Sequence, residues 1–351
     1  MDAYISLGGS YTRRELLTIN EFKEYCANQN LIYRFDIYTN DFLIKFLRST
    51  KYNIKATFTK FVNYLKFVDK YQIYSINEIT FPNTDKIKIF YPHNFHSITK
   101  DGNPILIQNL GELKINDINR ILPNELLDKY IIKNLEILNK KIFPACSVTY
   151  NKNIDKVFCI VDLLGLSTSL MHKNIFDFVN KQLKIVTNYY PCILDNMYFL
   201  NTSLIFRSIW ATCKYFYDED TRNKIFLLGY EYKNKLFEKI NPLNLPKLFG
   251  GECNCEPYGC IFSNKGPWNE NDPDYKKSNN IVYNGNYEIK NIDLNEEKLD
   301  LEENYNVNIH KIKSINEIND MVNEINNNNN IKKVEIIGDN EEGLQVFNTI
   351  S

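Results

Sequence analysis

The feature that most constrains this chain is a series of short apolar segments separated by stretches of helical periodicity. Each segment has the length of a strand and is apolar nearly throughout, as expected for strands covered on both faces. The segments are PILIQNL from Pro104, KVFCIVDLLG from Lys156, NMYFLNTS from Asn196 and KIFLLGY from Lys224. Helical stretches occupy 126–143, 174–190 and 203–216, and another follows at 231–240. This alternation predicts an α/β fold with a mainly parallel sheet.

The opening third of the chain is helical in pattern. Apolar residues recur at helical spacing over 42–47 and again over 54–68. Asn40 and Asn53 precede the two stretches and are predicted to cap them. A basic turn, residues 48–51, joins them. We therefore expect a small helical bundle over residues 12–75, ahead of the α/β domain over residues 85–275.

The last part of the chain has a different composition. Residues 276–351 are rich in Asn and charged residues, and they include five consecutive asparagines at 326–330. Such a segment cannot bury enough apolar surface to hold a fold, so we predict that it is largely disordered. The final stretch, from Lys332, is expected to add one short strand.

Composition narrows the function classes. The net charge is -1, so no global basic field indicates a nucleic-acid partner. The first residues lack the charged and then apolar pattern of a secretory signal. No apolar run reaches the roughly 18 residues of a membrane-spanning helix. The eight cysteines show no regular framework, so we expect free thiols in a reducing, cytosolic compartment, with only peripheral membrane contact.

Three cysteines, Cys253, Cys255 and Cys260, gather within eight residues. A structural zinc site needs four ligands, and no fourth Cys or His follows nearby, since the next histidine is His310. We therefore predict no metal site and interpret the cysteines as incidental thiols in a loop that leaves the domain. The earlier histidines, His93 and His96, are expected to be ordinary surface or loop residues.

Nucleotide and hydrolase signatures are also missing. Neither G-x-x-x-x-G-K-[ST] nor G-x-G-x-x-G occurs. The stretch GLSTS at 165–169 has the position of a nucleophile elbow, but Ser169 stands where the second glycine belongs. No catalytic residue and no cofactor are therefore predicted.

Seven segments occur in a specific order along the chain. They are FLIKFLRSTKYNIKA, FYPHNFHSITKDGNPILIQNLG, FPACS, VDLLGLS, VTNYYP, NKIFLLG and NLPKLFGG, and GPWNENDPDY follows them. In this order they resemble the CRAL-TRIO phospholipid-transfer proteins of the secretory-pathway type, which bind phosphatidylinositol and phosphatidylcholine. The resemblance covers roughly residues 16–275. It implies a helical bundle followed by a lipid-binding domain whose pocket is closed by a mobile helical gate.

The resemblance places the gate in NTSLIFRSIWATCKYFYDED, from Asn201. Its apolar residues exceed what one side of a buried helix requires, which suits a helix facing a pocket on one side and lipid on the other. A helix simply packed all round is the alternative. Gly250 and Gly251 would supply either a hinge or a tight turn. The predicted gate and acyl-pocket residues are Leu204, Phe206, Ile209, Trp210, Phe216 and Tyr217.

For phosphatidylinositol, the resemblance implies headgroup contacts from a Thr and a Lys three residues apart. Here these are Thr221 and Lys224, and the basic turn of the bundle adds Lys51. A hydroxyl and an ammonium suit inositol and phosphate oxygens. Thr50 and Cys192 stand where the family has an arginine and a glutamate.

For phosphatidylcholine, the serines of GLSTS match the family's choline-phosphate contacts. These are Ser167 and Ser169. Leu106 and Lys141 replace tyrosines that line the choline site in the family. Because an aromatic cage favours quaternary ammonium groups, phosphatidylinositol is the leading ligand.

The sequence thus predicts a cytosolic, peripherally membrane-associated protein that binds and transfers a phospholipid without covalent chemistry. Within the same class, the alternative is a lipid sensor that presents its ligand to a phosphoinositide kinase. The alternative of another class is a lipid hydrolase with an unrecognised nucleophile.

Overall fold

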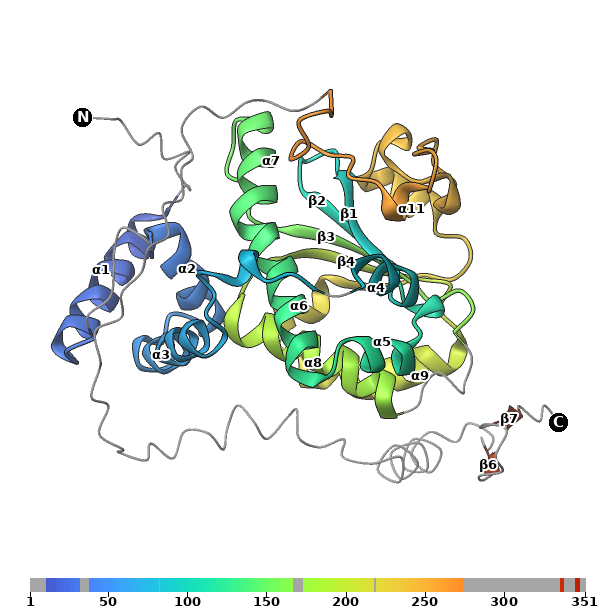
Figure 1. Ribbon diagram of the computed structural model, residues 1–351. Coiled ribbons are helices and arrows are strands. Elements are labelled where there is room, and N and C mark those ends of the chain that lie inside the picture. The colour runs from blue at the N-terminus through green and yellow to red at the C-terminus, as the bar shows by residue number, and fades with distance from the viewer. Residues whose placement is uncertain are drawn as a thin grey trace.

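The computed structural model describes residues 11–31, 38–81, 83–166, 173–217, 219–273, 335–337 and 345–347. Four helices come first, a five-stranded sheet whose strands alternate with further helices follows, and short helical turns come after it (Figure 1). The helices are α1 Arg13–Asn28, α2 Asn40–Ser49, α3 Ile54–Tyr71, α4 Thr84–Phe90, α5 Ile115–Ile121, α6 Asn124–Ile137, α7 Phe143–Tyr150, α8 Lys173–Tyr189, α9 Leu204–Cys213, α10 Glu219–Asn223 and α11 Lys233–Lys239. The strands are β1 His93–Ile98, β2 Pro104–Asn109, β3 Val157–Asp162, β4 Leu194–Leu200, β5 Ile225–Leu227, β6 Glu335–Ile337 and β7 Gln345–Phe347.

Short helical turns connect these elements. A π-helical turn, η3, joins α6 to α7, so the helix predicted to end at 143 continues to Tyr150. The 3-10 turns are η1 Ile76–Glu78, η2 Leu110–Glu112, η5 Lys214–Phe216, η6 Pro242–Asn244, η7 Lys247–Phe249 and η8 Cys260–Phe262.

The sheet has the order β1-β2-β3-β4-β5. Strands β2 to β5 pair in parallel, which confirms the predicted α/β fold and all four predicted strands. The first strand, β1, pairs antiparallel with β2 and was missed in the sequence. Its residues, HNFHSI, mix polar and apolar side chains, because β1 lies at the edge of the sheet and is covered by an irregular segment.

Strand register divides the sheet into two faces. Side chains of paired residues point to the same side, and successive residues alternate. The outer face is closed by α11, η6 and η7, whose Leu236, Ile240, Leu245 and Phe249 pack on it. Its side chains are almost fully buried: Ile105, Ile107, Phe158, Ile160, Tyr198 and Leu200.

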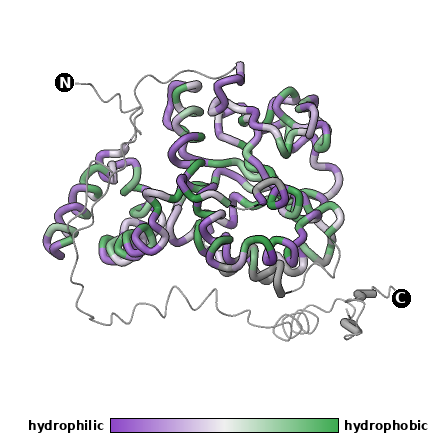
Figure 2. Tube along the Cα trace, in the orientation of Figure 1, coloured by the Kyte–Doolittle hydropathy of each residue, from purple (hydrophilic) through white to green (hydrophobic). Residues whose placement is uncertain are grey.

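The inner face points the other way, toward α5, α6 and α8 (Figure 1). One continuous apolar core joins this face to these helices and to the N-terminal bundle. Figure 2 shows the hydrophobic residues running along the central strands, while polar residues alternate with them on the surrounding helices. The inner-face side chains are Leu106, Gln108, Cys159, Val161, Met197, Phe199, Ile225 and Leu227.

The bundle of α1, α2 and α3 has an aromatic core. Phe61 meets Phe22 edge-on with ring centres 5.9 Å apart, and Phe46 at 5.8 Å. The prediction that Asn53 caps α3 is confirmed, because its side chain accepts from the Ala56 amide at 3.0 Å. The prediction for Asn40 is wrong, since it is the first residue of α2 and Thr39 precedes the helix.

The bundle is docked on the α/β domain rather than separated from it. The rings of Phe67 and Tyr189 stack with centres 3.8 Å apart, which joins α3 to the end of α8. Tyr71 donates to Asp128 at 3.3 Å, and Lys45 forms an ion pair with Asp155 at 3.4 Å. The position of the bundle is therefore set by packing as well as by charge.

Glu15 links the start of α1 to the end of α2. Its carboxylate accepts from the Thr12 amide at 2.9 Å, from Arg48 Nε at 2.9 Å and from Tyr52 Oη at 3.1 Å. The Thr12 hydrogen bond, helped by Arg48 and Tyr52, lowers the Glu15 pKa from 4.5 to about 2. A lowered pKa means stability that is present above pH 4.5 and lost as the pH falls toward 2.

We expect Glu15→Gln to lower the free energy of unfolding at pH 7 by about 1.5 kcal/mol, the value of a hydrogen bond to a charged group. Denaturant titrations at pH 7 and pH 3 should show that the variant loses less stability on acidification than the native chain does. The matched control is Glu24→Gln, at an exposed position on the same helix. Equal pH dependence in all three proteins would contradict the assignment.

At the end of the chain, β6 and β7 pair antiparallel, with Glu335 opposite Phe347. The sequence predicted one short strand there, and two form. The other residues of 276–351 lie outside the described ranges, so the predicted disorder stays a prediction. In the described part of the chain, no helix is both long and apolar enough to cross a membrane.

Candidate functional site

The two faces of the sheet are filled unequally. On the outer face, side chains of β2 and β4 are closed off, whereas their inner-face neighbours Leu106, Met197 and Phe199 are only half-buried. These residues lie on central strands beneath a layer of helices, where a close-packed interface would bury them. The layer therefore leaves part of the surface of these three side chains accessible, whereas Cys159 and Val161 on the same face are buried. Gln108 shares the face, and its Nε2 donates to Tyr91 Oη at 2.9 Å.

The inner face is also poor in polar surroundings. Burial raises the pKa of the Cys159 thiol to about 12, and the nearby Asp195 adds to the effect. Burial disfavours the charged form of a group because an apolar medium solvates a charge poorly. The centre of this face therefore favours apolar over charged contents.

Helix α9 packs against this face through contacts with Phe199 and is fastened at its start. Ser203 caps it by accepting from the Phe206 amide at 3.1 Å. Arg207 donates from Nε to Thr202 Oγ1 at 3.0 Å, and Thr202 Oγ1 in turn donates to the Leu228 carbonyl at 2.7 Å. These bonds tie the first turn to the ends of β4 and β5.

A line of aromatic side chains connects α9 to the inner face. Phe206 and Trp210 approach Phe199 with ring centres 5.2 and 6.3 Å away, and Tyr217 stacks on Trp210 at 5.6 Å. Leu204, in contrast, is 73% exposed. Among its described side chains, α9 therefore has aromatic groups toward the sheet and an exposed apolar residue, Leu204, at its first position.

The structure brings together four of the predicted gate residues, Leu204, Phe206, Trp210 and Tyr217, at or just after α9. The other two, Ile209 and Phe216, lie in this helix and the following turn η5, but their side chains are outside the described set. The gating motion itself stays a prediction.

Three lysines act electrostatically on Cys192, which lies just before β4. Burial raises the pKa of the Cys192 thiol, while the charges of Lys224, Lys60 and Lys45 act against that rise. The thiol donates to the Lys45 carbonyl at 3.5 Å. Lys45 lies in α2, Lys60 in α3 and Lys224 directly before β5, so the group forms where the bundle meets the sheet.

Lys224 is the residue of this group that the sequence predicted. It is 25% exposed and pairs with Asp220, which is 75% exposed. Its backbone amide donates to the Thr221 carbonyl at 3.1 Å, so the predicted pair joins the last turn of α10 to the residue before β5. An ion pair with so exposed a partner is weak and is easily exchanged for another anion.

Of the three remaining predicted headgroup residues, the structure describes only Lys51. Lys51 is exposed in the turn between α2 and α3, with a φ of 52°. Ser167 and Ser169 lie outside the described residues. Leu106, at a position of the expected choline site, is half-buried on the inner face, and Lys141 is exposed in the π-helical turn.

Sequence reasoning missed Lys45 and Lys60. Both lie on helices of the bundle, and in the sequence they look like any other exposed lysine. Lys60 donates to Ser49 Oγ at 3.0 Å, and Lys45 pairs with Asp155. Only the docking of the bundle against the sheet domain brings them near Lys224, so no local pattern could have identified them.

The two predicted hinge glycines have packing roles. Gly250 ends η7 with a φ of 84°, a conformation that favours glycine. A Cβ on Gly251 would lie 2.0 Å from the Leu245 carbonyl oxygen. The segment there is held by backbone bonds from Gly251 to Pro246 at 3.1 Å and from Cys253 to Leu245 at 3.0 Å. The hinge role stays a prediction.

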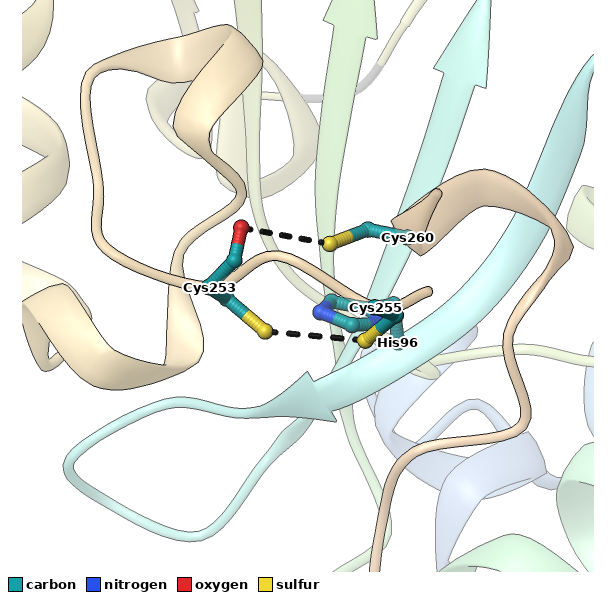
Figure 3. A group of neighbouring side chains, drawn as sticks. All are labelled: His96, Cys253, Cys255 and Cys260. Atoms are coloured by element: carbon teal, nitrogen blue, oxygen red, sulfur yellow. Dashed lines mark hydrogen bonds between the residues drawn. The ribbon is translucent and has the colours of Figure 1, made fainter. Parts of the chain in front are cut away.

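A second cluster lies at the edge strand. The ligand atoms of His96, Cys253, Cys255 and Cys260 all lie within 4.8 Å of one another (Figure 3). The expectation that His96 and His93 are surface or loop residues is wrong, because both are buried in β1. Each has a partner for its Nδ1 atom: His93 Nδ1 lies 2.8 Å from the Tyr91 carbonyl, and His96 Nδ1 lies 2.9 Å from Ser263 Oγ.

Comparison with known proteins gives consistent matches. The family described as CRAL/TRIO domain matches residues 89–251. The phosphatidylinositol/phosphatidylcholine transfer protein SFH11 of Arabidopsis thaliana is 34% identical over 233 residues, which are 65% of this chain and 61% of that protein. The Sec14 cytosolic factor of Schizosaccharomyces pombe is 31% identical over 229 residues, which are 65% of this chain and 79% of that protein.

The chain covers less than two thirds of the plant relatives. It spans 61% of SFH11 and 42% of another Arabidopsis thaliana protein, SFH7, to which it is 33% identical. Among solved structures, the crystal structure of Sfh5 aligns with a TM-score of 0.48 and 16% identity, over 64% of this chain and 84% of that one.

Proposed function

The chain belongs to the CRAL/TRIO family, among its Sec14-like members, and from this premise we propose that it binds one phospholipid molecule and moves it between membranes. The lipid is enclosed between the inner face of the sheet and α9, and no covalent bond is made or broken. The protein would meet membranes from the cytosol and only peripherally, through apolar groups such as Leu204.

The observation that supports this most is the unequal filling of the sheet. Leu106, Met197 and Phe199 keep accessible surface beneath helices, while the outer-face side chains Ile107, Ile160 and Tyr198 are buried. Moving one CH2 group from an apolar medium to water costs about 0.8 kcal/mol, so two acyl chains cost on the order of 20 kcal/mol. A carrier must therefore replace the bilayer almost completely, and an apolar, covered space does so.

We propose phosphatidylinositol as the preferred ligand. Its phosphate would replace Asp220 as the partner of Lys224, and the charges of Lys45 and Lys60 would support it. The Thr221 hydroxyl would contact phosphate or inositol oxygens. The three lysines near Cys192 favour an anionic lipid, whereas phosphatidylcholine carries no net charge and gains less from them.

Lys224→Gln is expected to lower the rate of phosphatidylinositol transfer between vesicles about tenfold. The lost hydrogen bond to a charged group is worth roughly 1.5 kcal/mol, which corresponds to about that factor. Transfer of phosphatidylcholine should stay within about twofold. Both rates are measured with labelled lipid and donor and acceptor vesicles of equal composition.

The matched control is Lys235→Gln. Lys235 also pairs with an exposed acid, Glu238 at 2.8 Å, but it lies on α11 at the outer face. It should leave both transfer rates unchanged. If Lys224→Gln reduced the transfer of both lipids equally, Lys224 would not be a headgroup contact.

Two other functions are separated by simple measurements. A lipid hydrolase would convert the bound lipid during incubation, which mass spectrometry of the extracted lipid detects. A sensor that presents its lipid to a phosphoinositide kinase would raise the kinase's turnover without moving lipid between vesicles. The proposal predicts intact lipid and transfer in the absence of any kinase.

A further inference from the structure

We propose that His96, Cys253, Cys255 and Cys260 bind one zinc ion, which fastens the C-terminal segment of the domain to the edge strand β1. The sequence argument against a metal lacked a fourth ligand near the three cysteines. The fold supplies it from the other end of the domain, because β1 runs beside the cysteine segment (Figure 3).

The spacing of the donor atoms suits tetrahedral zinc. Zinc–sulfur bonds of about 2.3 Å at tetrahedral angles put two thiolate sulfurs about 3.8 Å apart. Cys253 Sγ and Cys255 Sγ are 3.7 Å apart. All four donors lie within 4.8 Å of one another, so side-chain adjustments of about 1 Å would bring them to the four corners of one tetrahedron.

The imidazole of His96 is prepared as a ligand. Ser263 Oγ donates its proton to the Cys260 carbonyl at 2.9 Å. His96 Nδ1 lies 2.9 Å from Ser263 Oγ and must therefore be the donor in that second hydrogen bond. The Nε2 atom then carries the lone pair. It is buried and has no hydrogen-bond partner. Such a second hydrogen bond that sets the tautomer is typical of zinc-binding histidines.

The charge of the site is also balanced. Three thiolates and a neutral imidazole around Zn²⁺ carry a net charge of -1. Lys265 Nζ lies 3.3 Å from Cys253 Sγ and donates to the Leu243 carbonyl at 3.0 Å. A lysine held against one of the sulfurs stabilises a thiolate there.

The surrounding backbone makes the site a structural one. The Ser97 backbone amide donates to the Lys265 carbonyl at 2.8 Å, and the Asn94 side chain donates to the Ser263 carbonyl. Residues 263–265 therefore run alongside β1. This covers a strand edge that would otherwise expose unpaired groups. With four protein ligands the site is closed, as structural zinc sites are, and it leaves no open position for catalysis.

A disulfide explains the cluster less well. A disulfide would need a sulfur–sulfur distance of about 2.05 Å. Any pair would leave the third cysteine and the free nitrogen of His96 without a role. Zinc uses all four donors at once, which is why we choose it over a redox centre.

The test uses the full chain, untagged, purified with a reductant and without a chelator. Zinc is counted per chain by elemental analysis and by native mass spectrometry. We expect one zinc per chain, lost in Cys255→Ser and in His96→Asn. The matched controls are Cys146→Ser and His93→Asn, at buried positions of the same residue types, and both should retain the ion. Circular dichroism shows which variants are folded, and the half-buried Cys255 is the mildest site to change.

Cobalt gives a second readout. Co²⁺ added to the chelator-treated chain should produce thiolate-to-metal absorption in the native protein and not in Cys255→Ser. Ser263→Ala should weaken zinc binding by about 10–100-fold, as loss of a partner that orients a ligand does. A folded native chain that holds no zinc, zinc retained in both ligand variants, or a disulfide between two of the cysteines under reducing purification would each overturn the proposal.

Discussion

Met197→Trp is expected to remove co-purifying lipid and to lower the transfer of every phospholipid about a hundredfold. Met197 lies on the inner face of β4, opposite Cys159 and Ile225, and is half-buried. The indole would occupy the space of roughly four methylene groups of an acyl chain, and at about 0.8 kcal/mol each their loss costs about 3 kcal/mol. Vesicle transfer assays and lipid extraction from the purified protein measure both effects.

The control for this change is Phe226→Trp. Phe226 is on the neighbouring strand but points to the outer face, where its ring lies 5.0 Å from that of Tyr198, and it is 40% exposed. Enlarging it should leave transfer unchanged. If Met197→Trp kept its lipid and folded normally, the inner face would not hold acyl chains, and the proposed carrier function would lose its main support.

Gly251→Ala is expected to lower the free energy of unfolding by about 3 kcal/mol. Its Cβ would lie 2.0 Å from the Leu245 carbonyl oxygen and 2.6 Å from the Leu245 carbonyl carbon, both of which are backbone atoms that cannot rotate away. Overpacking of a closed site costs about 1–3 kcal/mol, and backbone contacts lie at the upper end. Denaturant titration of the full chain measures the loss.

Gly229→Ala is the matched control, because its Cβ would come no nearer than 3.7 Å to the end of the Arg207 side chain. Its effect should stay within about 0.5 kcal/mol. If Gly251→Ala instead kept full stability but slowed lipid exchange, Gly251 would act as a hinge rather than as a packing position.

The candidate site was predictable in part. Thr221 and Lys224 lie three residues apart in one short segment, so the resemblance could indicate both as candidate headgroup contacts. The resemblance placed the gate in the segment that forms α9, and its apolar residues, more than one helical face requires, supported that placement. The gate role stays a prediction. Lys45 and Lys60 could not be found this way, since they join Lys224 only when the bundle docks on the sheet.

The strands show the same division. The four parallel strands were predicted because each is an apolar run, which is what burial on both faces requires. Strand β1 was missed because His93, Asn94 and His96 are polar. They are tolerated at a buried edge since each finds a hydrogen-bond partner, and two of these partners come from Ser263, far along the chain.

The amino-acid sequence by itself determined the α/β class, the helical bundle and the parallel strands, because periodicity and apolar runs are local properties. The headgroup residues were implied by the family resemblance, and their role stays a prediction. Only the tertiary structure decided which lysines surround Cys192 and that His96 faces Cys253, Cys255 and Cys260. The physical reason is that strand pairing and helix docking bring together residues from distant parts of the chain, and no spacing within one segment records that meeting.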